Sequence, residues 1–452
     1  MANNRDENQA AFISALRTEH PDGLGKGWGR SWRLMGSSAK LARKLLAAGK
    51  GNTDVDLSPR DLEKVATLVQ QLGSLKGLPM KFGQIISYLD LELPEEMRRM
   101  LASLQTQSAA TPQAEIEATL HADLGLRGPA LWQGLNPEPV SIASIGQVYR
   151  GHLPSGEEVA VKVRHPAIAD AIRSDFRFAS VATGLSSALV PGMGATARDF
   201  TAEMEARLLE ECDYSLEAER QRLFGQLFAA HPCIVVPRVY DGWCGARVLT
   251  TAWEEGQTFD HFCNHAPQEA RDRAGAALFD FYIGALYRFG LFHADPHPGN
   301  YALRNDGHVV VFDYGCVRVF EPAVATAFAA LAQAVRDDQR EAICEALRQL
   351  GAEPSKNDKT YAHLRGLLRG FFGPMLTPGP HRIESRIAMK MSQIARDKIA
   401  LARLRLPGRL LFLFRIRFGL FAVLARLGAV NDWAALERQC FDERGTSPAL
   451  VP

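Results

Sequence analysis

The chain has little of what marks disulfide-rich, nucleic-acid-binding or membrane-spanning proteins. Its seven cysteines include no Cys-x-x-Cys pair, which argues against a disulfide framework or a zinc site and favours a reducing compartment. The formal net charge is only +1, so we expect no nucleic-acid partner. The polar N-terminus lacks the apolar core of a signal peptide, and arginines interrupt the most apolar segment, 406–430. We therefore expect a cytoplasmic protein without a transmembrane helix.

The first segment, residues 1–56, is polar and then strongly basic. Between Leu24 and Thr53 there are seven lysines or arginines and no acidic residue, with tryptophans and leucines interleaved. This pattern is typical of an amphipathic segment on an anionic membrane surface. An ordinary surface helix that packs its leucines on the protein has the same pattern, since many basic helices merely face water. Both interpretations stay open, and any membrane contact would be peripheral, at the inner face.

One stretch, Phe292–Gly315, carries most of the chemistry. A helix rich in aromatic residues over 281–292 is predicted to lead into it. Pro296 and Pro298 exclude a helix beyond that point, so residues 293–300 should form a loop. A hairpin should follow, with strands over 301–303 and 309–312 and a tight turn at 305–307.

This loop and hairpin would present Asp295, Asn300 and Asp313 side by side. Two carboxylates and an amide are oxygen ligands that suit Mg²⁺, and phosphoryl transfer needs such ligands and a base. A rival interpretation takes His293, His297 and Asp295 as the metal site of a hydrolase. Histidines four residues apart suit zinc only on a helix, which the prolines exclude. We favour a bracing role for His293 in the loop.

Lys162 lies inside a predicted strand of an earlier hairpin, whose strands span 142–151 and 158–163. A lysine buried there would be costly without an acidic partner or a phosphate, although an edge-strand lysine could simply face water. The acid-rich helix predicted over 198–224 can supply the partner. In it Asp213 and Glu217 would share one face, and Glu211 lies to the side.

The remaining chain is predicted to form a second hairpin over 235–251, a hinge over 252–256 and helices. The helices are expected over 111–124, 164–187, 258–288, 321–350, 358–373 and 381–428. We expect five regions: a basic N-terminal segment (1–56), a helical extension (57–130), an N-lobe (131–255), a C-lobe core (256–350) and C-terminal helices (351–452).

The order of these parts is that of a protein-kinase-like fold. A hairpin of small residues, a strand lysine, an acidic helix, a hinge, His-x-Asp-x-x-x-x-Asn, a hairpin and Asp-x-Gly follow one another. Lys162 would hold the nucleotide phosphates, Asn300 and Asp313 would hold Mg²⁺, and Asp295 would orient or deprotonate the nucleophile. We predict an α+β, bilobal kinase-like fold that takes ATP or ADP with Mg²⁺. Predicted nucleotide contacts also include Ser144, Gly146, Val148 and Trp253.

Six segments together resemble the AarF/UbiB family of atypical kinase-like proteins over residues 60–320: LPMKFGQ, SIASIGQVY, VAVKV, ECDYSLEAE, HADPHPGN and DYG. Lys81 and Gln84 match its KxGQ motif, and Glu211 with Asp213 matches its ExD motif. Glu217 falls where the partner of the nucleotide lysine lies. The resemblance implies a helical N-terminal extension that folds over the active site, meets the ExD motif and closes the groove for a peptide substrate. These motif residues are therefore expected at the nucleotide site.

The resemblance further implies ATP hydrolysis in the metabolism of prenyl quinones or related lipids, with a prenyl-lipid precursor or lipid-biosynthesis proteins as partners. Ser141 and Ile142 stand where the family usually has alanine, so nucleotide preference is left open. Two other functions stay open: a small-molecule phosphotransferase of the aminoglycoside- or choline-kinase type, and a nucleotide-binding pseudokinase scaffold. Lys81 and Gln84 argue against the first, and retention of Lys162, Asp295, Asn300 and Asp313 argues against the second.

Overall fold

The computed structural model describes residues 110–443 except 144, 175–204, 207, 353, 355–356 and 385–407. The basic segment, the helical block before residue 108, Lys81, Gln84 and Ser144 therefore lie outside the described residues. The described part belongs to one compact unit, Ala109–Pro452.

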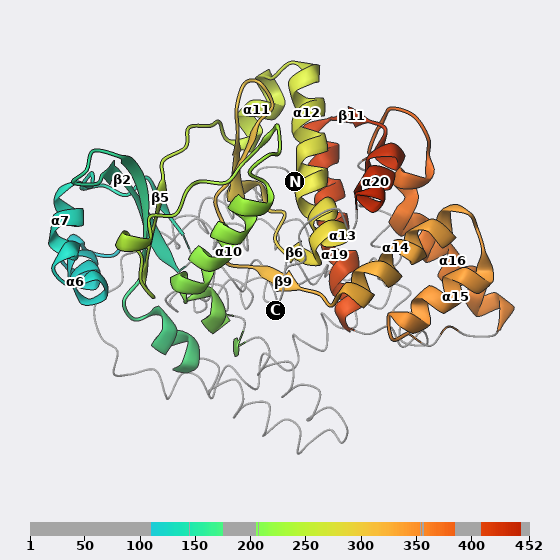
Figure 1. Cartoon of the computed structure of the whole chain (residues 1–452), viewed down its shortest axis with the longest axis horizontal. Coiled ribbons are helices and arrows are strands. Elements are labelled where there is room, and N and C mark those ends of the chain that lie inside the picture. The colour runs from blue at the N-terminus through green and yellow to red at the C-terminus, as the bar shows by residue number, and fades with distance from the viewer. Residues whose placement is uncertain are drawn as a thin grey trace, which may run out of the picture. The chain divides into compact units, whose positions relative to one another are not determined.

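The first layer is a four-stranded antiparallel sheet in the order β1-β2-β3-β5 (Figure 1). Helices α6 (Gln113–Leu124) and α7 (Arg127–Gln133) belong to this part of the chain, and α6 packs on β3 and β5. Alternation along β3 buries every second residue, a valine each time, in the core shared with α6. Lys162 therefore points to the opposite face. The strands are β1 (Ser141–Ile142), β2 (Gly146–His152), β3 (Glu158–Arg164) and β5 (Val248–Ala252).

Helix α10 (Tyr214–Leu227) packs against β5. The single helix predicted over 198–224 is wrong, because the chain leaves the helical conformation at Asp213 (φ −99°, ψ 97°). The Asp213 carboxylate accepts a hydrogen bond from the Ser215 amide and caps α10, a role for which aspartate competes well. Asp213 and Glu217 therefore do not share a helical face.

The hairpin predicted over 235–251 forms only in part. Strand β4 (Ile234–Val235) pairs in parallel with β8 (Val309–Val311) in another sheet, and a 3₁₀ turn (Asp241–Trp243) follows. Pairing with β5 begins only at Arg238, whose carbonyl accepts from the Ala252 amide. Pro237, between the two pairings, has no amide to donate to either.

The helix predicted over 258–288 divides once, after α11 (Phe259–His265). Helix α12 (Gln268–Phe279) then runs through a π-helical turn (Asp280–Gly284) into α13 (Ala285–Phe289) without a break. The helix predicted to reach residue 292 ends early because Gly290 adopts φ +66°. Leu291–His293 is instead a strand, β6, which pairs with β9 (Val317–Val319). This strand delivers the chain to the Asp295 loop.

The predicted hairpin after the loop is confirmed. Strand β7 (Tyr301–Leu303) pairs with β8, and the turn between them contains Gly307 at φ +89°. Pro298–Asn300 forms a 3₁₀ turn that enters β7. All three residues of each strand are buried, so this hairpin is part of the large core.

The C-terminal region adds α14 (Pro322–Arg336), α15 (Arg340–Gln349), α16 (Asp358–Phe372), a 3₁₀ turn (Gly373–Leu376), α19 (Gly408–Leu427) and α20 (Trp433–Asp442). Two predictions here are wrong. Asp338, at φ +55°, separates α14 from α15, and His381–Arg382 is a strand (β10) paired with Val430–Asn431 (β11). No helix within the described ranges is long and apolar enough to span a membrane.

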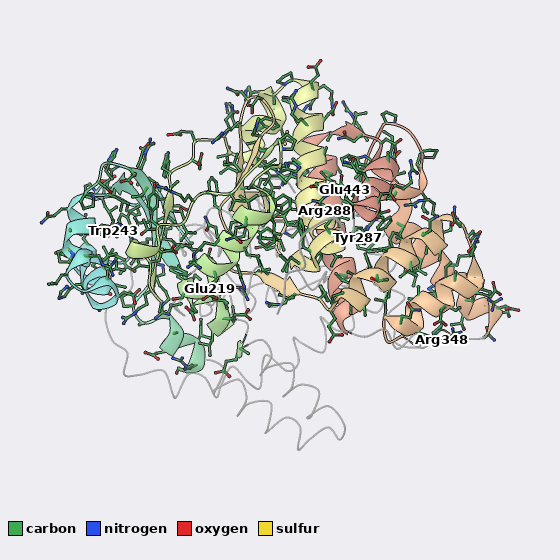
Figure 2. All side chains as sticks on the ribbon, viewed as in Figure 1. Glu219, Trp243, Tyr287, Arg288, Arg348 and Glu443 are labelled. Atoms are coloured by element: carbon green, nitrogen blue, oxygen red, sulfur yellow. The ribbon has the colours of Figure 1, made fainter. Side chains whose placement is uncertain are left out.

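These helices share the core of the β7–β8 hairpin, and an ion pair joins the residue after α20 to α13. Arg288 of α13 lies beside Glu443, which follows α20 (Figure 2). The Arg288 guanidinium is 2.9 Å from the Glu443 carboxylate and 2.6 Å from Asp280. The end of the described chain is therefore fastened to the helix that precedes the Asp295 loop.

Candidate active site

Lys162, Glu217 and Asp313 come together from β3, α10 and the end of β8. The Lys162 ammonium lies 2.9 Å from both oxygens of Glu217 and 3.7 Å from Asp313 Oδ2. Glu217 is buried, with 2% of its side chain exposed, whereas Asp313 is 38% exposed. The ion pair predicted between Lys162 and Glu217 is thus confirmed. Asp313 is the carboxylate that remains accessible to solvent.

Lys162 stays protonated in this setting. Burial alone lowers its pKa, but the carboxylates of Glu217 and Asp313 outweigh burial and raise the pKa well above its ordinary value. The Glu217 carboxylate also accepts a hydrogen bond from the Tyr314 amide, at 3.4 Å. This bond ties α10 to the residue that follows Asp313, so hydrogen bonds and ion pairs connect the lysine, the helix and the Asp-x-Gly turn.

Hydrogen bonds to the main chain and side chain of Asp295 hold its loop in place. The Asp295 carbonyl accepts hydrogen bonds from Asn300 Nδ2 and from the Tyr282 hydroxyl, both at 3.1 Å. Its carboxylate accepts from the His297 amide at 3.2 Å. The loop therefore fixes the direction of the Asp295 side chain, and Asp295 itself is partly exposed.

His293 braces this loop, as predicted. Its ring is fully buried and lies between Asp313 and Asp295: Nε2 is 2.6 Å from the Asp313 carbonyl, and Nδ1 is 3.4 Å from the Asp295 amide. A carbonyl must accept and an amide must donate, so Nε2 carries the proton and the imidazole is neutral. Burial lowers the pKa of His293, which favours the same neutral form.

The zinc-type interpretation is not supported. No group of three or more histidine, cysteine, aspartate or glutamate side chains is arranged to hold a metal among the residues that the structure describes. His297 instead accepts a hydrogen bond from the Gly299 amide through Nδ1, at 3.0 Å.

Asn300 and Asp313 have a donor set that fits Mg²⁺. Because Asn300 Nδ2 donates to Asp295, its amide oxygen is directed to the other side of the group. The main chain joins the two residues, since the Phe312 amide donates to the Asn300 carbonyl at 2.9 Å. Asp313 Oδ1 accepts from the Gly315 amide at 2.9 Å, which fixes its carboxylate. An amide oxygen and a partly exposed carboxylate are hard ligands of the kind that Mg²⁺ takes.

The two acids in the ExD motif have different surroundings, and Glu211 is the one whose contact with the Asp-x-Gly turn is seen. A side chain built on Gly315 would place its Cβ 3.9 Å from Glu211 Cγ, whereas Asp213 caps α10. Arg220 reaches the same turn from α10 and donates to the Gly315 carbonyl at 2.7 Å. Sequence reasoning missed Arg220, because nothing in the pattern sets it apart from the other arginines of the predicted helix.

Of the predicted nucleotide contacts that the structure describes, Val148 and Gly146 lie on the strand beside Lys162, whereas Trp253 lies elsewhere. Val148, half-buried, lies directly opposite Lys162 in the β2–β3 register, and Gly146 begins the same strand. Trp253 lies at the hinge, where the Arg150 guanidinium stacks 4.4 Å from its ring centroid. The described contacts of Trp253 are with Arg150, Glu158 and Glu255, so they do not place it at the lysine.

Tyr214, the first residue of α10, was also missed. Its ring lies beneath the lysine, with Lys162 Nζ 5.0 Å from the ring centroid. The only signal was its position directly after the ExD motif, and nothing in the sequence pattern separates such a tyrosine from a core residue.

Comparison with known proteins agrees with this arrangement. A family model described as the ABC1 atypical kinase-like domain matches residues 103–347. The chain is 30% identical over 295 residues to the Arabidopsis thaliana chloroplast protein named Activity of bc1 complex kinase 3, covering 63% of this chain and 40% of that protein. It is 28% identical over 322 residues to the rat mitochondrial atypical kinase COQ8B, covering 70% of this chain and 60% of the relative.

A solved structure from Mycobacterium tuberculosis, the complex of Rv3197 with erythromycin, has a TM-score of 0.62 and 28% identity. The similarity covers 86% of this chain and 98% of that one. The predicted α+β, kinase-like fold is thereby confirmed. Since the family match covers more than half of the sequence, the chain belongs to the ABC1 family of atypical kinase-like proteins, the AarF/UbiB family that its motifs resemble.

Proposed function

We propose that this protein binds ATP with Mg²⁺ and hydrolyses it in support of quinone or other isoprenoid-lipid metabolism. The observation that carries the proposal is the Lys162 ammonium held between buried Glu217 and partly exposed Asp313. A cation fixed beside an exposed carboxylate suits a nucleotide phosphate on one side and its metal on the other.

Each residue has a task in this proposal. Lys162 holds the phosphates, and Asn300 with Asp313 holds Mg²⁺, which would neutralise charge that develops on the transferred group. Asp295, directed by its hydrogen bond from the His297 amide, orients an attacking water molecule. His293, neutral and buried, keeps Asp295 and Asp313 in register and takes no proton itself.

Family membership and the sequence resemblance support the lipid part. The relatives named above are longer than the matched segments, so the activity of those whole proteins is not transferred. We propose that the basic segment between Leu24 and Thr53 provides peripheral contact with an anionic membrane surface at its inner face, and that a prenyl-lipid precursor is the client.

A second candidate is phosphoryl transfer to a soluble small molecule. The observation that favours it is that the similar mycobacterial structure is a complex with erythromycin, a soluble small molecule. In that case a hydroxyl or amine of the acceptor, in place of water, would lie at Asp295.

The test measures nucleotide binding and phosphate release by the full chain. We expect Mg²⁺-dependent ATP binding, phosphate release that rises with anionic liposomes and a prenyl-phenol mimic, and loss of Mg²⁺-dependent binding in Asp313→Ala. Asp306→Ala, in the turn at the far end of the same hairpin, is the matched control and should bind as the wild type does. Unchanged binding in Asp313→Ala would refute the site. Turnover that requires a soluble alcohol or amine, without a response to lipid, would favour the second candidate.

A further inference from the structure

Tyr214 lies between the nucleotide lysine and the base of the nucleotide loop. Its side chain is fully buried, and its ring centroid is 5.0 Å from Lys162 Nζ. A Cβ built on Gly146 would lie 2.5 Å from the Tyr214 hydroxyl oxygen, so the hydroxyl rests against the Gly146 main chain. Gly146 closes a tight turn with Ala143, whose amide donates to the Gly146 carbonyl at 2.8 Å. The tyrosine thus spans the distance from the ammonium to this loop.

The Tyr214 hydroxyl has no hydrogen-bond partner among the described residues. Most buried polar groups have a hydrogen-bond partner, because a group that loses its hydrogen bond to water on burial and gains no other destabilises the fold. Burial raises the pKa of Tyr214, so the hydroxyl remains protonated and can donate. The hydroxyl is thus free to donate to a ligand, and Glu217 on the same helix already accepts from Lys162 and from the Tyr314 amide.

We infer that the Tyr214 hydroxyl donates a hydrogen bond to a phosphate oxygen of the bound nucleotide. The inference rests on the proposed function and adds a phosphate-binding residue to it. A phosphate brings oxygens that only accept, and the neighbouring ammonium draws them to this position. Gly146 has no side chain, so only its main chain lies against the Tyr214 hydroxyl.

The inference assigns nucleotide binding to the Tyr214 hydroxyl and packing to its ring. Tyr214→Phe removes the first and keeps the second. Phenylalanine keeps the packing and the contact with Lys162 but removes the donor. We expect the dissociation constant for ATP to rise about tenfold, as for the loss of one hydrogen bond to a charged group. Adenosine, which has no phosphate, should bind as tightly as to the wild type. The melting temperature of the nucleotide-free variant should stay equal or rise, because an unsatisfied buried hydroxyl has been removed.

Tyr361→Phe in α16 is the matched control. Its hydroxyl is also buried without a partner among the described residues, but it lies on a C-terminal helix. This variant should keep or raise the melting temperature and leave ATP affinity unchanged.

Calorimetric titration with ATP and adenosine, together with thermal melts, gives a separate result for each failure. If wild-type protein does not bind ATP, the proposed function and the inference both fail. Wild-type-like ATP affinity in Tyr214→Phe overturns the inference alone, and so does an equal loss of affinity for adenosine. A lower melting temperature of the nucleotide-free variant also overturns it, since the hydroxyl would then have a structural partner such as a fixed water.

Discussion

Lys162 holds two carboxylates that would otherwise repel each other. Glu217 is buried beside it, and Asp313 reaches it at 3.7 Å. Removing the cation therefore leaves two anions facing each other, whereas removing Glu217 still leaves Lys162 with Asp313. The two partners of one ion pair should differ in their effect on stability.

We expect Lys162→Met to lower the free energy of unfolding by about 3 kcal/mol or more, the usual cost of leaving a buried charge unpaired. Glu217→Gln should cost only about 1 kcal/mol, because glutamine keeps an acceptor for the Tyr314 amide. Urea denaturation of nucleotide-free protein measures both values. A larger loss in Glu217→Gln than in Lys162→Met would contradict this account.

Asp280, at the start of the π-helical turn, is a second buried charge with a defined pH response. Burial raises its pKa, but hydrogen bonds from His231 and Arg288 prevail and lower it from 3.8 to about 2. A depressed pKa contributes stability above the unfolded-state value of 3.8, and this contribution is lost as the pH falls towards 2.

The asparagine of Asp280→Asn has no ionisable group, so comparison with this variant isolates the pH-dependent stability that Asp280 contributes. Between pH 5 and pH 2 the wild type should lose about 2 kcal/mol of stability more than the variant does. Denaturation curves of both proteins across that range give the difference. A difference that stays constant with pH would show that Asp280 is not ionised in an ion pair in the folded state.

At the scale of elements, Gly290 decides where α13 ends and the strand before the Asp295 loop begins. Its φ of +66° is strained for any residue with a Cβ, and a Cβ built there would lie 2.7 Å from the Phe320 carbonyl oxygen. That carbonyl cannot withdraw easily, because the Phe320 amide donates to the Gly290 carbonyl at 2.8 Å.

Gly290→Ala should therefore destabilise the protein by about 2 kcal/mol. Gly366→Ala in α16 is the control: nothing lies within 4 Å of its added Cβ, and alanine favours a helix interior by about 0.5–1 kcal/mol. Thermal melts of the two variants should shift in opposite directions. A stabilised Gly290→Ala would mean that the helix end tolerates a Cβ.

At the scale of the whole described unit, the C-terminal helices are part of the kinase-like core. Glu437 of α20 and Arg417 of α19 are almost fully buried and lie 2.6 Å apart, and Arg336 of α14 reaches Glu437 at 3.2 Å. The Tyr287 hydroxyl of α13 donates to the same carboxylate. One carboxylate thus joins four helices, so these elements should unfold together.

Glu437→Ala leaves two guanidinium groups without their carboxylate, and we expect a loss of at least about 3 kcal/mol in one cooperative transition. Glu345→Ala removes an exposed pair with Arg348 on α15 (Figure 2) and should cost no more than about 0.5 kcal/mol. Calorimetry distinguishes the outcomes. Two separate transitions in Glu437→Ala would show that the C-terminal helices fold independently.

The elements that sequence reasoning predicted well are those with local causes. The β7–β8 hairpin follows from a tight turn and two apolar runs, and the loop before it follows from Pro296 and Pro298. The predictions that failed depended on distant partners. Strand β4 pairs with β8 and not with β5, and β10 pairs with β11, and no local pattern encodes such pairings.

The sequence by itself determined the order of the parts, the Asp295 loop and the hairpin after it, because strand alternation and prolines act locally. It predicted an acid of the 198–224 segment as the partner of Lys162, which the family resemblance narrowed to Glu217, and it predicted His293 as the brace of the loop. Only the tertiary structure decided that Asp213 caps a helix while Glu211 lies beside Gly315, and that Tyr214 has a buried hydroxyl without a partner among the described residues. These facts depend on which side chains meet across β3, α10 and the β7–β8 hairpin, and burial and distance exist only once those elements have packed.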